Sequence, residues 1–320
     1  MTIPAEDISP APDPVPRGPV TATLNFASRP APGVKVVNHV DGGPRNLGVD
    51  ARAVLIADIR GREAAFTLDR DGFELVSGLA PSLEDSAPGS GFADDASVRR
   101  LYYPEVARLL LRRVPGSTRV LIFDHTVRRA DAAAPRRPVF EVHVDQTAAG
   151  AARRARFHLS SPPSAASFSF PPGAPDPDLR RCRYRIVNVW RPLTRGPVAE
   201  RPLAFASGAS VDDARDLIPV EHRYPLAATA AAAAPIATPP GYVGETAAVA
   251  YHPTQRWYYA SGVRPDERLL LECFDSAALA PDAAVPSRGR TPHTAFEDPR
   301  TPPDAEPRES IEVRALVFGP

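Results

Sequence analysis

Two residues near the middle of the chain, His143 and Asp145, have the types and spacing of metal ligands. They lie in the run Phe140-Glu-Val-His-Val-Asp-Gln-Thr, which we expect at the end of a β-strand. Alternate side chains of a strand share a face, about 7 Å apart along the backbone, so this imidazole and this carboxylate can bind one metal ion. Because the pattern fixes only two positions, the alternative is an exposed strand end.

A second histidine, His293, follows in the run Pro292-His-Thr-Ala-Phe-Glu-Asp-Pro, between turn residues. Two histidines and one carboxylate make a facial triad, which leaves three metal positions open. This arrangement suits non-haem Fe(II) chemistry with O₂, because the metal must bind a cosubstrate and O₂ together.

Fifteen positions after His293, Arg308 and Ser310 open the last expected strand and share one of its faces. Such iron centres commonly use 2-oxoglutarate, whose far carboxylate needs a planar, permanently charged partner. Arginine supplies that fork and a serine hydroxyl adds one donor. Arg314 lies on the same face and is a rival for this role. The alternative is that Arg308, Glu312 and Arg314 form an ordinary solvated strand face.

The composition excludes several classes of protein. With 38 basic and 38 acidic residues, the formal net charge is zero, so we expect no nucleic-acid partner and no anionic membrane surface as partner. Two cysteines are too few for a disulfide scaffold or a thiolate zinc cluster. No apolar stretch reaches ~18 residues, and the acidic, proline-rich start does not resemble a signal peptide. We therefore expect a cytoplasmic protein.

The elements that must position these residues are mostly short strands. There are 39 prolines and 20 glycines, which favour many short elements over long helices. We expect a mainly β fold, a sandwich or jelly roll with flanking helices. Residues 1–18 are predicted to be a flexible proline-rich arm, and residues 19–320 a single domain with an N-terminal strand extension and an Ala/Pro-rich insertion near 225–240.

Apolar periodicity gives the individual elements. One clear helix is predicted over 97–114, and a short one over 210–217 with Ser210 as its N-cap. Residues 53–59 and 65–68 are predicted to pair as a hairpin, followed by a turn over 69–72. Loops are expected at 84–96 and 160–178. The other strands are predicted at 20–26, 34–40, 73–76, 118–127, 139–144, 183–189, 247–251, 255–259, 268–274 and 310–318.

Six segments in order resemble the CmcJ/NvfI-type (AsaB-like) oxidoreductases over about residues 95–318. They are His143-Val-Asp145, Asn188-Val-Trp-Arg-Pro-Leu193, Gln255-Arg-Trp-Tyr-Tyr259, Glu267 to Asp275, His293-Thr-Ala-Phe296 and Arg308-Glu-Ser-Ile-Glu-Val-Arg314. The resemblance implies a double-stranded β-helix (jelly roll), Fe(II), 2-oxoglutarate and O₂, and oxidative tailoring of a small specialised metabolite. By this resemblance His143, Asp145 and His293 match the iron ligands, and Arg308 and Ser310 match the cosubstrate clamp of the wider superfamily.

Four further residues are candidates for the pocket. Asn188 and Trp190 share a strand face and are expected to line it, with Asn188 near the cosubstrate. Arg128 is a candidate to face the substrate, or else a charge at a strand end. For Trp190 and Tyr258 the alternative is core packing, which we favour.

Three questions stay open at the level of sequence. The segments 160–178 and 226–237 are either lids that set substrate choice or inert insertions. The main alternatives for function are an accessory protein that assists a partner enzyme and a metal-dependent hydrolase, which would leave Arg308 without a role. A homodimer or a pathway partner enzyme is also compatible with the sequence.

Overall fold

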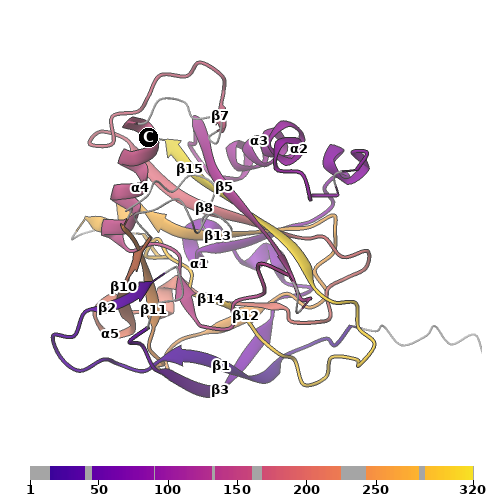
Figure 1. The fold of residues 1–320 in the computed structure, drawn as a ribbon, viewed down its shortest axis with the longest axis vertical. Coiled ribbons are helices and arrows are strands. Elements are labelled where there is room, and N and C mark those ends of the chain that lie inside the picture. Colours follow the sequence, from indigo (N-terminus) through magenta and orange to yellow (C-terminus); the bar gives the residue numbers. More distant parts are fainter. Residues whose placement is uncertain are drawn as a thin grey trace, which may run out of the picture.

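Two β-sheets that face each other form the body of the protein in the computed structural model (Figure 1). The structure describes residues 15–39, 45–89, 91–131, 134–160, 168–224, 243–280 and 285–319. This is the mainly β jelly roll with flanking helices that the sequence predicts. No helix within these ranges is long and apolar enough to cross a membrane.

The smaller sheet has six strands, each antiparallel to its neighbours. In spatial order they are β4 (Phe73–Val76), β13 (Arg268–Asp275), β8 (Arg183–Pro192), β15 (Glu309–Gly319), β5 (Arg119–Arg129) and β7 (Phe168–Phe170). The longest ladder joins β15 to β5 and β8, so the carboxy-terminal strand lies in the middle of this sheet.

The larger sheet has nine strands. Their spatial order is β1 (Val20–Ala27), β3 (Val49–Asp58), β12 (Trp257–Tyr259), β9 (Leu203–Ala206), β14 (His293–Ala295), β6 (His143–Val144), β11 (Val243–Val249), β10 (Leu217–Arg223) and β2 (Val36–His39). Two short strands, β14 and β6, lie at its centre and carry the two candidate histidine ligands.

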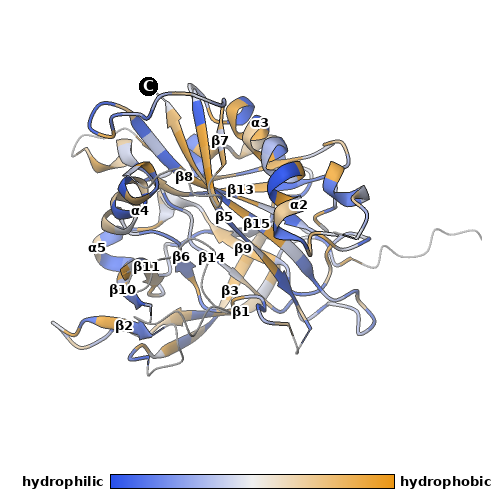
Figure 2. Ribbon diagram, turned by 45° about the horizontal axis from the view of Figure 1, so that its top comes forward, coloured by the Kyte–Doolittle hydropathy of each residue, from blue (hydrophilic) through white to orange (hydrophobic). Residues whose placement is uncertain are grey.

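Alternation along β15 divides its residues between two environments. Ile311 and Val313 face outward and pack with helix α3 (Tyr103–Arg113). Ser310 and Glu312 point the other way, into the space between the sheets. Figure 2 shows hydrophobic residues concentrated along the strands of this sheet, such as β13 and β15.

Aromatic contacts join the two sheets directly. Phe73 of β4 and Phe205 of β9 lie with ring centroids 4.5 Å apart, and both are fully buried. They belong to a core cluster that also includes Trp190 and Leu271. Burial of this apolar surface holds the sheets at a fixed separation beside the candidate metal ligands.

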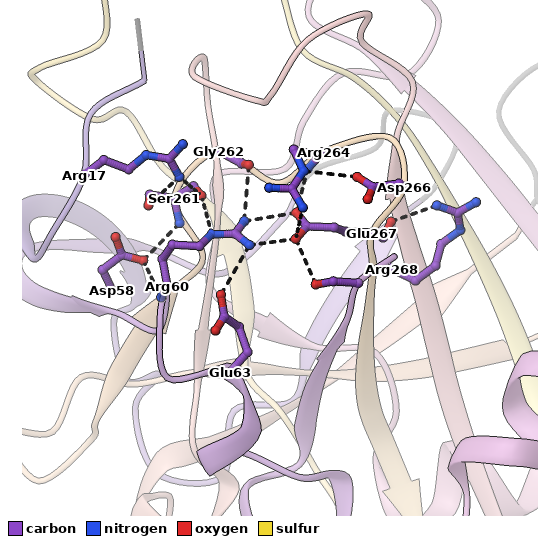
Figure 3. Close-up of polar contacts among 11 residues, drawn as sticks. Arg17, Asp58, Arg60, Glu63, Ser261, Gly262, Arg264, Asp266, Glu267 and Arg268 are labelled. Atoms are coloured by element: carbon purple, nitrogen blue, oxygen red, sulfur yellow. Dashed lines mark hydrogen bonds and ion pairs between the residues drawn. The ribbon is translucent and has the colours of Figure 1, made fainter. Parts of the chain in front are cut away.

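A polar clasp at one end of the sandwich adds a second link between the sheets (Figure 3). Arg60, just after β3, donates to both carboxylate oxygens of Glu267, at 2.7 and 3.0 Å. Glu267 lies just before β13, is fully buried, and also accepts from the hydroxyl of Ser77 and the backbone of Arg264. The clasp therefore ties β3 of one sheet to β13 of the other.

The predicted helix over 97–114 is confirmed, with an irregular start. It comprises α2 (Asp95–Ser97), a π-helical turn (Val98–Tyr102) and α3. The backbone N–H of Tyr103 bonds to the carbonyl of Val98, five residues back. Pro104 follows and has no N–H to donate, so the wider turn lies where the regular hydrogen-bond ladder is interrupted.

Other short helices surround the sheets. They are α1 (Leu68–Asp71), α4 (Ala148–Ser160), α5 (Asp213–Asp216) and the 3₁₀ turns η1 (Glu63–Ala65), η2 (Leu83–Ser86), η4 (Gly208–Ser210) and η6 (Ser276–Leu279). Helix α4 was not predicted. Its buried positions are mostly small residues, such as Ala151 and Ala155, which give only a weak periodic signal.

Several local predictions are wrong. Residues 65–68 form no hairpin with 53–59, because β3 pairs with β1 and β12 instead, and Thr67 caps α1. The strand predicted over 139–144 is regular only at His143–Val144. The cap of the short helix near 213 is Asp212, which accepts from the backbone of Arg215, and not Ser210.

The N-terminal arm is only partly covered by the structure. Residues 1–14 lie outside the described ranges, but Val15 is buried and Arg17 donates to the carbonyl of Ser261, so the end of the predicted arm is packed. The insertion predicted at 225–240 and residues 161–167 of the predicted loop also lie outside the described ranges. The rest of that loop contains β7.

Candidate metal centre and cosubstrate cavity

The three candidate metal ligands converge although 150 residues separate the two histidines. Their potential ligand atoms all lie within 4.8 Å of one another. Oδ1 of Asp145 is 3.4 Å from Nε2 of His143 and 4.0 Å from Nε2 of His293. His143 and His293 pair across β6 and β14, so the ladder itself brings them together.

Both imidazoles are oriented in the same way. Nδ1 of His143 lies 2.8 Å from the carbonyl of Glu141, and Nδ1 of His293 lies 3.0 Å from that of Thr291. Because a carbonyl oxygen can only accept, each Nδ1 carries the hydrogen. Each Nε2 is therefore the ring nitrogen that faces Asp145, and it becomes available as a metal ligand once it is deprotonated.

The Asp145 carboxylate is held by its other oxygen. Oδ2 accepts from Nδ2 of Asn188 at 2.7 Å and lies 3.4 Å from Nε of Arg314. Burial alone would raise the pKa of Asp145, but the donors His143 and Arg314 outweigh it and hold that pKa well below its usual range. The group is therefore ionised, with Oδ1 directed at the histidines.

The electrostatics of the histidines differ. Burial would lower the pKa of His143, but its hydrogen bond to Asp145 and the carboxylate charge outweigh burial and raise it. Burial and the charge of His143 lower the pKa of His293. Metal binding would need both rings neutral, and an ion placed between them would displace any proton on His143.

A narrow cavity adjoins the triad. Its apolar lining comprises Val139, Trp190, Leu203 and Ala295, and its polar lining comprises Arg128, His143, His293, Thr294, Arg308, Ser310 and Glu312. Ser310 and Glu312 of β15, and Arg308 just before that strand, thus reach the same space as the two histidines. Arg308 and Glu312 are buried, so the alternative of an ordinary solvated strand face is wrong for them.

Arg308 has the features of an anion-binding group. It is 2 % exposed, its Nη1 donates to the carbonyl of Arg201 at 2.6 Å, and its buried Nε has no hydrogen-bond partner among the described residues. Its guanidinium lies 5.9 Å from the centre of the Trp190 ring. Burial, together with the nearby charge of Arg128, lowers the pKa of Arg308 to about 9. A bound carboxylate would satisfy Nε and offset the cost of burying this charge.

Arg314, the rival for the clamp, is already fully engaged. Its guanidinium donates to Asp124 at 2.9 Å, to Glu312 at 2.8 Å and to Thr126 at 3.2 Å, and it approaches Asp145. It therefore has little capacity left for another carboxylate. Through these contacts Arg314 instead connects Asp145, a candidate metal ligand, to Glu312 in the lining of the cavity.

The remaining candidates are distributed between the cavity and the core. Trp190 and Arg128 line the cavity, whereas Asn188 contacts Asp145 behind it. Tyr258 packs against Phe66 and Phe73 and is not among the described residues that line the cavity. Tyr258 is thus partly buried and packs against the edge of the aromatic core.

Sequence reasoning assigned no role at this site to two acidic residues, Asp124 and Glu312, although it placed Glu312 on the same strand face as Arg308. Both lie on the inner faces of long strands, two or four positions from residues that were singled out. Strict alternation from Arg128 along β5, and from Ser310 along β15, would have found them.

Comparisons with known proteins agree with this geometry. Residues 24–318 match the family model described as "Oxidoreductase/YMDC permease-like domain". The hydroxylase/desaturase poxK of Penicillium oxalicum is 34% identical over 317 residues, which cover 95% of this chain and 93% of that protein. The Fe(II)/2-oxoglutarate-dependent dioxygenase nvfI of Aspergillus novofumigatus is 33% identical over 86% of each chain.

A solved structure has the same fold. The iron and alpha-ketoglutarate-dependent endoperoxidase NvfI superimposes with a TM-score of 0.72 at 26% identity, over 95% of this chain and 99% of that one.

Proposed function

Because the chain belongs to the family of Fe(II)/2-oxoglutarate-dependent oxygenases that contains these relatives, we propose that His143, Asp145 and His293 bind its Fe(II). The enzyme uses Fe(II), 2-oxoglutarate and O₂. The observation that carries the ligand assignment is the convergence of two Nε2 atoms and one carboxylate oxygen within 4.8 Å. Three protein ligands would leave open positions for the other reactants.

In this proposal Arg308 and Ser310 bind the far carboxylate of 2-oxoglutarate. The unpartnered Nε of Arg308 supports this role, since a bidentate carboxylate would use it. Trp190 supports the guanidinium from one side. Asn188 and Arg314 act on the metal ligand instead of the cosubstrate, because both donate toward Oδ2 of Asp145.

The bound Fe(II) would supply the centre at which 2-oxoglutarate and O₂ react. The chain's own part is to hold the ligands, orient the cosubstrate and exclude water through the apolar walls at Val139, Leu203 and Ala295. We propose that the substrate is a small specialised metabolite that undergoes hydroxylation, desaturation or a related oxidation. The relatives support this range, because they are a hydroxylase/desaturase and an endoperoxidase.

We also propose a cytoplasmic location, which the two free cysteines, Cys182 and Cys273, support because such thiols persist in a reducing compartment. A homodimer or a pathway partner enzyme is compatible with the sequence and stays a hypothesis. The alternatives of an accessory protein and a metal-dependent hydrolase gain no support from the relatives.

An anaerobic titration tests the proposal. Addition of Fe(II) and 2-oxoglutarate to metal-free protein should produce a weak visible charge-transfer band, which His143→Ala should abolish. Arg308→Gln should weaken 2-oxoglutarate binding by about 100-fold while Fe(II) affinity stays within about 3-fold. A wild-type protein that binds Fe(II) but gives no band would contradict the assignment. Ni²⁺, Cu²⁺ and Zn²⁺ must be removed first, because they compete with Fe²⁺ at such sites.

A further inference from the structure

A second arginine lies beside the proposed clamp. Arg128 of β5 pairs in register with Ser310 of β15, and both residues line the same cavity as Arg308. The backbone N–H of Ala130 bonds to the carbonyl of Arg308 at 2.8 Å, so the β5–β15 ladder fixes the two arginines on either side of Ser310.

Neither guanidinium forms an ion pair with a carboxylate in the described part of the chain, although the backbone N–H of Arg308 donates to Glu200. The guanidinium of Arg128 donates to the carbonyl of Arg137, and that of Arg308 donates to the carbonyl of Arg201. Glu312 lines the same cavity, but its carboxylate accepts from Arg314. Among the described residues, two cations therefore share a largely buried cavity and their guanidinium groups donate only to backbone oxygens. This is costly unless an anion joins them.

The charges around the cavity indicate what that anion is. Six ionised side chains line the cavity or join it through the Arg314 ion pairs, and their formal charges cancel: Arg128, Arg308, Arg314, Asp124, Asp145 and Glu312. A divalent metal on the triad raises the sum to two positive charges. Arg136, Arg201 and Glu200 also lie near the two arginines and together add one further positive charge. A dianion therefore offsets the excess positive charge better than a mono-acid does.

We propose that Arg128 is the second guanidinium of the cosubstrate clamp. The proposal rests on the proposed function. It moves Arg128 from the substrate side of the pocket to the cosubstrate side, so that the far carboxylate is held between Arg308, Ser310 and Arg128.

The test compares two oxo acids in anaerobic Fe(II) titrations that follow the visible band. One is 2-oxoglutarate. The other is 2-oxopentanoate, which also has five carbons but carries a methyl group in place of the far carboxylate. For Arg128→Gln we expect the Kd of 2-oxoglutarate to rise about 10- to 100-fold, because one charge-assisted hydrogen-bonding partner is lost. The Kd of 2-oxopentanoate should change less than about 3-fold.

Two further variants make the result specific. Arg128→Lys keeps the charge without the fork and should give an intermediate loss. Arg129→Gln is the matched control, because Arg129 is the next residue of β5 and pairs with Glu309 instead of lining the cavity. It should leave both Kd values unchanged.

The outcomes are distinguishable. Arg128 is not part of the clamp if Arg128→Gln gives the same Kd values as Arg129→Gln. The same conclusion follows if Arg128→Gln raises the Kd of both oxo acids by the same factor. If wild-type protein gives no band with 2-oxoglutarate, the proposed function itself fails. Should Arg128→Gln not fold by circular dichroism, the folded Arg128→Lys protein decides: an unchanged preference between the two oxo acids overturns the proposal.

Discussion

The side-chain amide of Asn188 lies 2.7 Å from Oδ2 of Asp145, so a fully buried amide on the six-stranded sheet holds a metal-ligand candidate carried by the nine-stranded sheet. Oδ1 of Asn188 has no partner among the described residues. The orientation is unambiguous, because only the NH₂ end of an amide can donate to a carboxylate.

Replacement of Asn188 by leucine, which has a similar volume, should weaken metal binding. Without the donor, the Asp145 carboxylate can rotate away from the histidines, and we expect the Kd of Fe(II) to rise about 10- to 100-fold. Anaerobic calorimetry measures this change. Thr126→Val is the control, because Thr126 contacts Arg314 but not Asp145. Equal effects of both variants would mean that Asn188 only fills space.

Arg314→Gln should reduce both stability and metal affinity. It leaves Asp124 and Glu312 buried without their cation, a defect that typically costs about 3–5 kcal/mol. The double variant Arg314→Gln/Glu312→Gln removes one of the unpaired acids, and should therefore lose less than the sum of the single variants. Urea denaturation of the metal-free proteins tests this. Strict additivity would show that the two side chains act independently.

Glu272 should make the protein less stable as the pH rises from about 4.5 to 7. Burial, reinforced by the charge of Asp275, raises the pKa of Glu272 to about 7, although Arg185 and the hydroxyl of Ser287 act against this. Because the folded state then binds more protons than the unfolded state across this range, the free energy of unfolding falls by up to about 1.4 kcal/mol per pH unit.

Glu272→Gln should flatten that pH dependence. Chemical denaturation between pH 5 and pH 8 measures it, with Asp69→Asn as the control from the same cluster, since Asp69 is half exposed and lies 2.6 Å from Arg185. If the free energy of unfolding depends on pH as steeply in Glu272→Gln as in the wild type, another group causes that dependence.

Glu267→Gln should open the clasp between the sheets (Figure 3). The variant loses the paired interaction with Arg60 and leaves that guanidinium without its main partner, so we expect a loss of about 3 kcal/mol. Glu63→Gln is a matched control, because Glu63 contacts the same arginine at 3.4 Å from a partly exposed position and should cost less than about 1 kcal/mol. Thermal melts that rank the two variants equally would argue against a specific role for the clasp.

The sequence predicted the central features of this site but not their surroundings. Spacing by two residues identified the pairs His143/Asp145 and Arg308/Ser310, because alternation in a strand is a local property. Spacing did not decide whether Arg308 or Arg314 binds the cosubstrate carboxylate. What separates them is their partners: Asp124 lies 190 positions from Arg314, and such a contact depends on the register of β5 against β15. Pairing registers between distant strands are not encoded by local periodicity.

The errors in the fold have a similar origin. The segment at 65–68 has the apolar composition of a strand, but β3 finds its partners in β1 and β12, which are distant in sequence. Helix α4 is buried through alanines, and alanine is a weak marker of a buried face. His293 lies in a strand of only three residues, too short for its period to be recognised.

The contact between Phe73 and Phe205 also has a consequence for variation in this protein. The two histidines of the triad come from the nine-stranded sheet, and the arginines of the proposed clamp come from the six-stranded sheet. The Phe73 and Phe205 rings pack between the two sheets and help to set their separation. A substitution there that lets one layer slide slightly would preserve every strand ladder while misaligning the oxidant and its target. Such a variant would be as stable as the wild type in a folding assay. It would still consume 2-oxoglutarate, but it would not oxidise the substrate. Screens for damaging mutations in this chain therefore need to score product formed per oxo acid spent, and not thermal tolerance alone.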